Sequence, residues 1–111
     1  MTDKRFRVAS ALGIATIVLS TACYAAATTV IDQQRQRFSI SSLLILTGDT
    51  VSYVNYDDVR HNILVIGPDG SAVDKGLQEP EQTINVSFAR FGLYVVRCSI
   101  HQKMKMKIEV R

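Results

Sequence analysis

Apolar and charged side chains alternate strictly over the last eight residues of the chain. Counting from Met104, every second residue is apolar as far as Val110, and every residue between and after them is charged. A period of two residues is typical of a β-strand with one buried face. Residues 50–55 and 83–88 alternate in the same way. These three segments predict strands that each bury one face.

Turn residues separate further short apolar segments. The strongest turn signal is the run of Gly, Pro, Asp and Gly at residues 67–70. The pattern predicts seven or so short strands among eight segments, at residues 28–31, 38–40, 41–46, 50–55, 61–66, 83–88, 93–98 and 104–111. Residues 32–37 are predicted to form a polar connection, and residues 71–81 a loop with one helical turn near Leu77. Short strands at roughly ten-residue spacing indicate an all-β chain, a single-domain antiparallel Greek-key β-sandwich, with a small β-barrel as the alternative.

The first 27 residues differ from the rest. Lys4, Arg5 and Arg7 precede an apolar run at residues 8–19, and small residues follow at 25–27. This layout is typical of a secretory signal peptide, so we expect residues 1–27 to be a signal peptide and residues 28–111 the mature domain. A retained membrane anchor is one alternative, although a transmembrane helix needs roughly 20 apolar residues. Lipidation of Cys23 is another.

Removing residues 1–27 changes what the composition implies. The whole chain has 13 Lys and Arg against 10 Asp and Glu, and three of the basic residues and one acidic residue belong to the first 27. The remaining domain is nearly neutral, so no nucleic-acid partner is expected. It also keeps a single cysteine, Cys98. A lone thiol in an oxidising compartment suggests metal ligation, with a buried core thiol as the alternative.

Three residues with metal-binding side chains lie close together near the C-terminus. Cys98, His101 and Met104 fall within seven residues, and the only other histidine, His61, lies 37 positions before Cys98. Two imidazoles, one thiolate and a weak axial thioether form a blue-copper site. The same side chains leave two alternatives open, a zinc site with water as fourth ligand and a thiol enzyme using Cys98 with His101. Haem attachment is not expected, because the chain has no Cys-x-x-Cys-His motif.

The order and spacing of these residues resemble the cupredoxins, and within them the plastocyanin-like and amicyanin-like proteins. The resemblance runs from Phe38 to Val110. It rests on Gly48, Asp49, Thr50 and Val51 before a strand ending in Asn55, on His61 followed by Asn62, on Gly92 and Tyr94 ahead of Cys98, and on Cys98-x-x-His101-x-x-Met104-Lys105.

The resemblance implies a complete ligand set. It assigns His61, Cys98 and His101 as the residues that hold one copper ion, with Met104 as the axial ligand. Met106 lies on the same face of the last strand, and local pattern alone leaves it open as the axial residue. The shorter spacing and the Lys that follows Met104 favour Met104, with Met106 assigned to the core.

The resemblance also predicts how the ligands are supported. It implies that Asn62 ties the His61 strand to the 98–104 loop near Ser99. The chain departs from the usual pattern at Ile100, where the family generally has Pro, and at Gln102 and Lys103, where Pro and an apolar residue are common. These departures bear on the rigidity of the loop and on the usual apolar docking patch.

The expected function is that of a periplasmic blue copper protein that carries single electrons through Cu(I) and Cu(II), and not of an enzyme. Its expected partners are a redox donor and acceptor, such as an amine dehydrogenase and a c-type cytochrome, and the protein is expected to be a monomer. His101 is expected near the surface as the route for the electron. A copper-handling protein of the same fold is the alternative. Four basic residues form either a solvated face or a docking surface for an acidic partner: Arg97, Lys103, Lys105 and Lys107.

Overall fold

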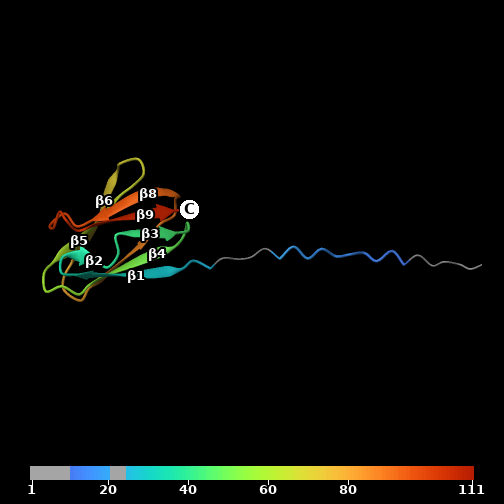
Figure 1. Cartoon of the computed structure of the whole chain (residues 1–111), viewed down its shortest axis with the longest axis horizontal. Coiled ribbons are helices and arrows are strands. Elements are labelled where there is room, and N and C mark those ends of the chain that lie inside the picture. Colours follow the sequence, from blue (N-terminus) through green and yellow to red (C-terminus); the bar gives the residue numbers. More distant parts are fainter. Residues whose placement is uncertain (1–10, 21–24) are drawn as a thin grey trace, which may run out of the picture.

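The computed structural model describes residues 11–20 and 25–111, and in these residues every regular element is a β-strand (Figure 1). The strands are β1 (Thr28–Gln34), β2 (Arg37–Phe38), β3 (Ser42–Ile45), β4 (Thr50–Asn55), β5 (His61–Ile66), β6 (Ala72–Gln78), β7 (Thr83–Ser87), β8 (Gly92–Arg97) and β9 (Lys105–Val110). The predicted all-β class is therefore confirmed. Cys23 and the basic residues Lys4, Arg5 and Arg7 of the predicted signal peptide lie outside the described residues.

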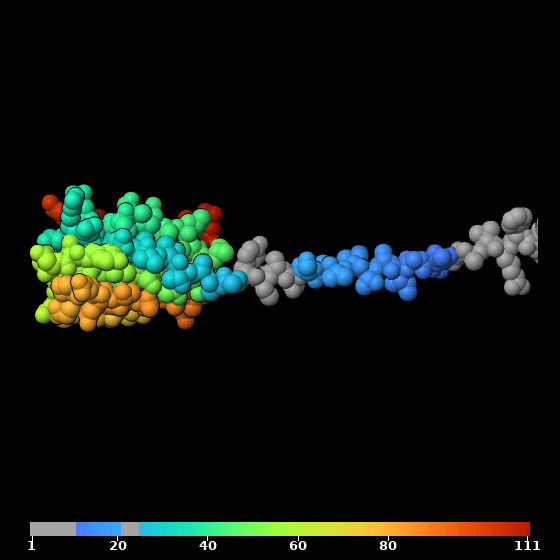
Figure 2. Space-filling view, turned by 90° about the horizontal axis from the view of Figure 1, so that it is seen from below, coloured from blue at the N-terminus to red at the C-terminus, as the bar shows by residue number. Residues whose placement is uncertain are grey.

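The strands form two sheets. One has the order β2-β1-β4-β7 and the other the order β3-β9-β8-β5-β6. Figure 2 looks onto the side that carries β1 in cyan and β7 in orange. Most neighbours are antiparallel, but β1 pairs with β4, and β3 with β9, in parallel. The chain changes sheets five times, first between β2 and β3 and last between β7 and β8, so strands far apart in sequence become neighbours. The predicted β-sandwich is confirmed, and these two parallel pairs are the exceptions to its antiparallel pairing.

The alternating segments bury one face between the sheets, as predicted. In β4 the buried residues are Val51, Tyr53 and Asn55, and in β9 they are Met106, Ile108 and Val110. The bounds predicted for residues 50–55 and 61–66 are those of β4 and β5. Burying these apolar faces between the two sheets holds the sandwich together.

Two predicted loops are in fact strands. Residues 72–78 form β6, which pairs with β5 at the edge of its sheet. Six of its seven side chains are at least partly exposed, so no burial pattern marked this strand in the sequence. The chain also stays extended to Gln34, because β1 pairs with β4 as far as Gln33 and Asn55. The polar connection is only a tight turn at Arg35 and Gln36, both with φ of 54°.

The loops that follow β4 and β8 lie at the same end of the sandwich as the turn between β1 and β2 (Figure 1). β1 begins, and β9 finishes, at the other end. Within residues 11–20 and 25–111 no helix has the length and apolar character needed to cross a membrane. The predicted metal ligands therefore all lie at one end of the sandwich, the end with the loops that follow β4 and β8.

Candidate metal centre

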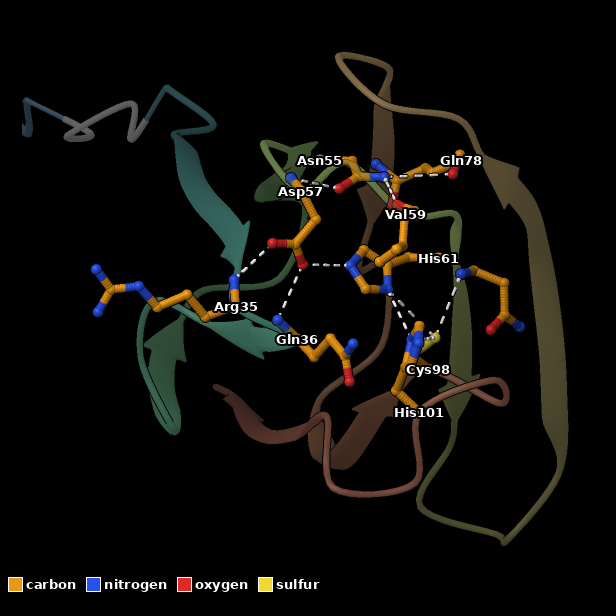
Figure 3. A network of polar contacts seen from close by, with 10 residues as sticks. Arg35, Gln36, Asn55, Asp57, Val59, His61, Gln78, Cys98 and His101 are labelled. Carbon is orange, nitrogen blue, oxygen red and sulfur yellow. Dashed lines mark hydrogen bonds and ion pairs between the residues drawn. The ribbon is translucent and has the colours of Figure 1, made fainter.

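His61 is the first residue of β5, and its imidazole is completely buried. The Nε2 atom donates a hydrogen bond to Oδ2 of Asp57 over 2.6 Å. A carboxylate acceptor keeps the proton on Nε2, so the lone pair of Nδ1 is available to a metal. Nδ1 points toward the 98–104 loop, as Figure 3 shows, and lies 3.8 Å from Sγ of Cys98.

Cys98 follows the last residue of β8 and is fully buried. Its sulfur accepts a hydrogen bond from the backbone N–H of Asn62 over 3.5 Å. A backbone donor stabilises negative charge on sulfur, and the thiolate is the form that binds metals. Cys98 is the only cysteine among the described residues and forms no disulfide.

The 98–104 loop is closed by its own backbone. The N–H of Cys98 donates to the carbonyl oxygen of Met104 over 3.0 Å, and the N–H of Met104 donates to the carbonyl oxygen of His101 over 2.9 Å. These two bonds hold the loop in a single turn that carries His101 back toward Cys98. The loop therefore has a defined conformation with Ile100, and not a proline, at its centre.

Asn62 links this loop to β5, as the resemblance predicted. Its Nδ2 donates to Oγ of Ser99 over 3.1 Å, and the N–H of Ser99 donates to its Oδ1 over 2.6 Å. Nδ2 also lies 3.3 Å from Oδ2 of Asp74, on β6. Asn62 directly follows His61 in the chain, so these bonds fix the position of β5 relative to the 98–104 loop.

Three donor atoms therefore converge. Nδ1 of His61, Sγ of Cys98 and a ring nitrogen of His101 all lie within 4.8 Å of one another. The two Nδ1 atoms are 3.0 Å apart, and Nδ1 of His101 lies 3.8 Å from the sulfur. His101 is partly exposed, while the other two residues are buried. Two imidazole nitrogens and one thiolate fit copper or zinc by their chemistry, and a buried thioether nearby favours copper.

The two candidate methionines have different surroundings. Met104 is fully buried where the 98–104 loop ends. Met106 is buried in β9, and its sulfur accepts a hydrogen bond from the hydroxyl of Tyr53 over 3.7 Å. Burial raises the pKa of the Tyr53 hydroxyl, so this group remains a donor. The Met106 sulfur thus has a partner in the core.

Asp57 is the residue of this site that the sequence analysis missed. It lies between the strands predicted at residues 50–55 and 61–66, where the pattern gave it no functional role. Oδ1 of Asp57 accepts the N–H of Arg35 over 2.5 Å, and Oδ2 accepts the N–H of Gln36 over 2.9 Å in addition to His61. Partial burial opposes ionisation, but these three hydrogen bonds outweigh it and lower the pKa of Asp57. A carboxylate four residues before a candidate ligand histidine was the available signal.

The comparisons with known proteins agree with this geometry. Residues 25–111 match the family described as copper binding proteins, plastocyanin/azurin family. The methylamine utilization protein MauL of Methylorubrum extorquens is 36% identical over 57% of this chain and 55% of its own length. Amicyanin of Paracoccus denitrificans is 31% identical over 73% of this chain and 63% of its own length. Both matches span less than two thirds of these relatives.

A solved structure has the same fold. The structure of a reduced amicyanin variant superimposes with a TM-score of 0.70 at 26% sequence identity, covering 79% of this chain and 86% of that one.

Proposed function

Because the chain belongs to the plastocyanin/azurin family of copper-binding proteins, we propose that it shuttles single electrons between redox proteins in the periplasm. It is a type 1 copper protein, an electron carrier and not an enzyme. The bound copper supplies a one-electron couple between Cu(II) and Cu(I). The observation that carries the proposal is the convergence of two imidazole nitrogens and one thiol sulfur within 4.8 Å at one end of the sandwich.

We assign four residues to the metal. Nδ1 of His61, Sγ of Cys98 and Nδ1 of His101 would hold the copper ion, and Met104 would supply the weaker fourth ligand. Support for the histidine nitrogens comes from the Asp57 bond, which leaves Nδ1 of His61 free. The alternative ligand, Met106, is disfavoured because its sulfur already accepts a hydrogen bond from Tyr53 in the core. This supports Met104 as the ligand.

The protein's part in electron transfer is to hold these ligands still. A site that changes little between two oxidation states needs little rearrangement when an electron moves, so a rigid frame favours fast transfer. Bonds from Asp57 and Asn62 fix the β5 side, and the closed 98–104 loop fixes the other. His101 is the partly exposed member of the set, and we assign it as the route by which electrons enter and leave.

The relatives suggest a setting for this function. One carries methylamine utilization in its name and another is amicyanin. We therefore propose an amine dehydrogenase as donor and a c-type cytochrome as acceptor, both met by a monomeric carrier. Residues 1–27 remain our candidate for the signal peptide that directs the chain to the periplasm.

The visible spectrum tests the proposal. Full-length protein loaded with Cu(II) should show an intense visible band from the Cys98 thiolate, and Cys98→Ser should abolish it. The matched control is Cys23→Ser, which removes the other cysteine of the chain and should leave the band unchanged. A wild-type protein that never colours with Cu(II), or a Cys98→Ser variant that stays coloured, would contradict a thiolate-bound copper.

A further inference from the structure

A hollow of about 540 Å³ lies directly beside His101. One wall comes from the turn between β1 and β2 and carries Arg35 and Arg37. The other comes from the 98–104 loop and the start of β9, and carries Lys103 and Lys105. We call this hollow the basic groove. It opens next to the one candidate ligand that reaches the surface.

All four basic side chains of the groove are exposed, and no Asp or Glu lines it. Among the described residues, the ion pairs involve other side chains: Arg60 with Glu79, Arg111 with Glu109, and His61 with Asp57. Residues 28–111 carry ten basic and nine acidic residues in all. The domain is therefore nearly neutral, but four of its ten basic residues line the groove beside His101 and no acidic residue lines it with them.

The arginine wall is held in place from inside the molecule. Arg35 and Gln36 both have φ of 54°, a left-handed conformation that other residues than glycine seldom adopt. The carboxylate of Asp57 accepts the N–H of each, and the same carboxylate holds His61, as Figure 3 shows. These bonds fix the backbone that carries Arg35 before binding, which lowers the entropy that docking must overcome. One side of the groove is thus held by the same aspartate that holds His61.

We propose that the basic groove is the docking surface for a redox protein that presents a patch of Asp and Glu carboxylates next to its own redox centre. This proposal rests on the proposed electron-carrier function and adds the chemistry of the partner. Arginine guanidinium groups pair with carboxylates in a two-point geometry, and the flanking lysines add attraction at longer range. Ile40, which lines the groove and is 39% exposed, provides apolar contact beside the charges, and Ile100, which directly precedes His101, is 50% exposed.

We infer a protein partner because the charges of the groove are spread over two chain segments, the one around the turn between β1 and β2 and the one that contains His101. Such a layout matches an extended acidic surface. Opposite charge on two proteins accelerates their encounter by roughly 10- to 1,000-fold at low salt. The groove thus brings a partner's carboxylates to the place where the electron leaves.

Electron transfer from reduced cytochrome b5, used as an acidic redox probe, tests the groove. The groove variant is Arg35→Glu with Arg37→Glu in the full-length, copper-loaded protein. The control is Lys75→Glu with Arg90→Glu, which changes the net charge equally with two exposed residues that do not line the groove. Stopped-flow measurement should show the second-order rate falling at least tenfold for the groove variant at low salt, and less than twofold for the control. The difference should disappear as salt rises.

The second wall gives an independent check. Lys103→Glu with Lys105→Glu should slow the reaction by a similar factor, since both walls face the same partner. Groove and control variants that slow equally would leave only an effect of net charge, and no slowing in either would mean that the groove does not take part in docking. Either outcome would overturn the proposal.

Binding and electron transfer are measured separately. Chemical-shift changes of the copper protein on adding the cytochrome report docking without any transfer. Docking at the groove without electron transfer would contradict the proposed function but keep the docking surface. Electron transfer at equal rates in all variants would contradict the docking surface but keep the function.

Discussion

An aspartate joins backbone segments at each end of the sandwich, but only one of the two also contacts a candidate metal ligand. At the end where β1 begins, Asp49 accepts the N–H groups of Ala27 and Leu46 over 2.9 and 3.0 Å. At the other end, Asp57 accepts two N–H groups from the turn between β1 and β2. Asp57 then takes a third hydrogen bond, from His61.

The two aspartates differ in what a substitution should affect, because only Asp57 also contacts the candidate metal site. Asp49 connects the start of β1 to the turn before β4, and its loss should affect stability alone. Asp57 makes the orientation of the His61 ring, a candidate ligand, depend on a turn 21 and 22 positions away in sequence. A change at this end should therefore affect stability and metal binding together.

Exchanging each carboxylate for an amide is the strongest test of this contrast. Asp57→Asn should lower copper affinity by roughly 10- to 100-fold, the usual loss when the hydrogen-bond partner of a metal-binding histidine is removed. Asp49→Asn should change it less than twofold. Competition with a copper chelator measures both.

The stabilisation of the folded protein by copper gives a second measurement on the two aspartate variants. A metal that binds only the folded state stabilises it by roughly 2.7 kcal/mol at a hundredfold excess over its dissociation constant. At one fixed copper concentration, the rise in melting temperature should be smaller for Asp57→Asn than for Asp49→Asn. Equal affinities and equal rises would show that Asp57, like Asp49, only closes a turn.

Substituting the two methionines extends this comparison, because it tests which of them belongs to the candidate metal site and which only to the core. Met106→Leu removes the acceptor of the Tyr53 hydroxyl in the core and should cost about 1 kcal/mol of stability, with spectrum and potential unchanged. Met104→Leu should leave copper bound and coloured but raise the reduction potential, because a weak axial ligand tunes the site. Voltammetry and thermal melting distinguish them. A potential that shifts only in Met106→Leu would reverse the assignment.

The smallest expected effect concerns pH at the far end. The N–H groups of Ala27 and Leu46 lower the pKa of Asp49 below its ordinary value of 3.8. Its contribution to stability should therefore be complete above pH 3.8 and should be lost as pH falls through the lowered pKa. Thermal melting of wild type and Asp49→Asn should differ at pH 6 and converge on acidification. A difference that stays constant below pH 3 would mean that the charge of Asp49 adds nothing.

Local sequence pattern determined much of the fold and of the site's immediate support. Alternation located β4 and β9 and their buried faces, because a strand with one face against a core needs apolar residues at every second position. The resemblance paired Asn62 with Ser99, and the structure confirms that pair. It also named His61, Cys98 and His101, whose donor atoms converge.

Only the tertiary structure decided those features that produce no alternation of apolar and polar residues in the sequence. β6 is an edge strand with little burial, held by backbone bonds to β5, so its composition read as a loop. The two parallel pairs depend on where the chain changes sheets. Asp57 and the basic groove bring together residues more than 20 positions apart. Sequence pattern reports which faces are buried, whereas packing alone decides which distant turns and loops meet.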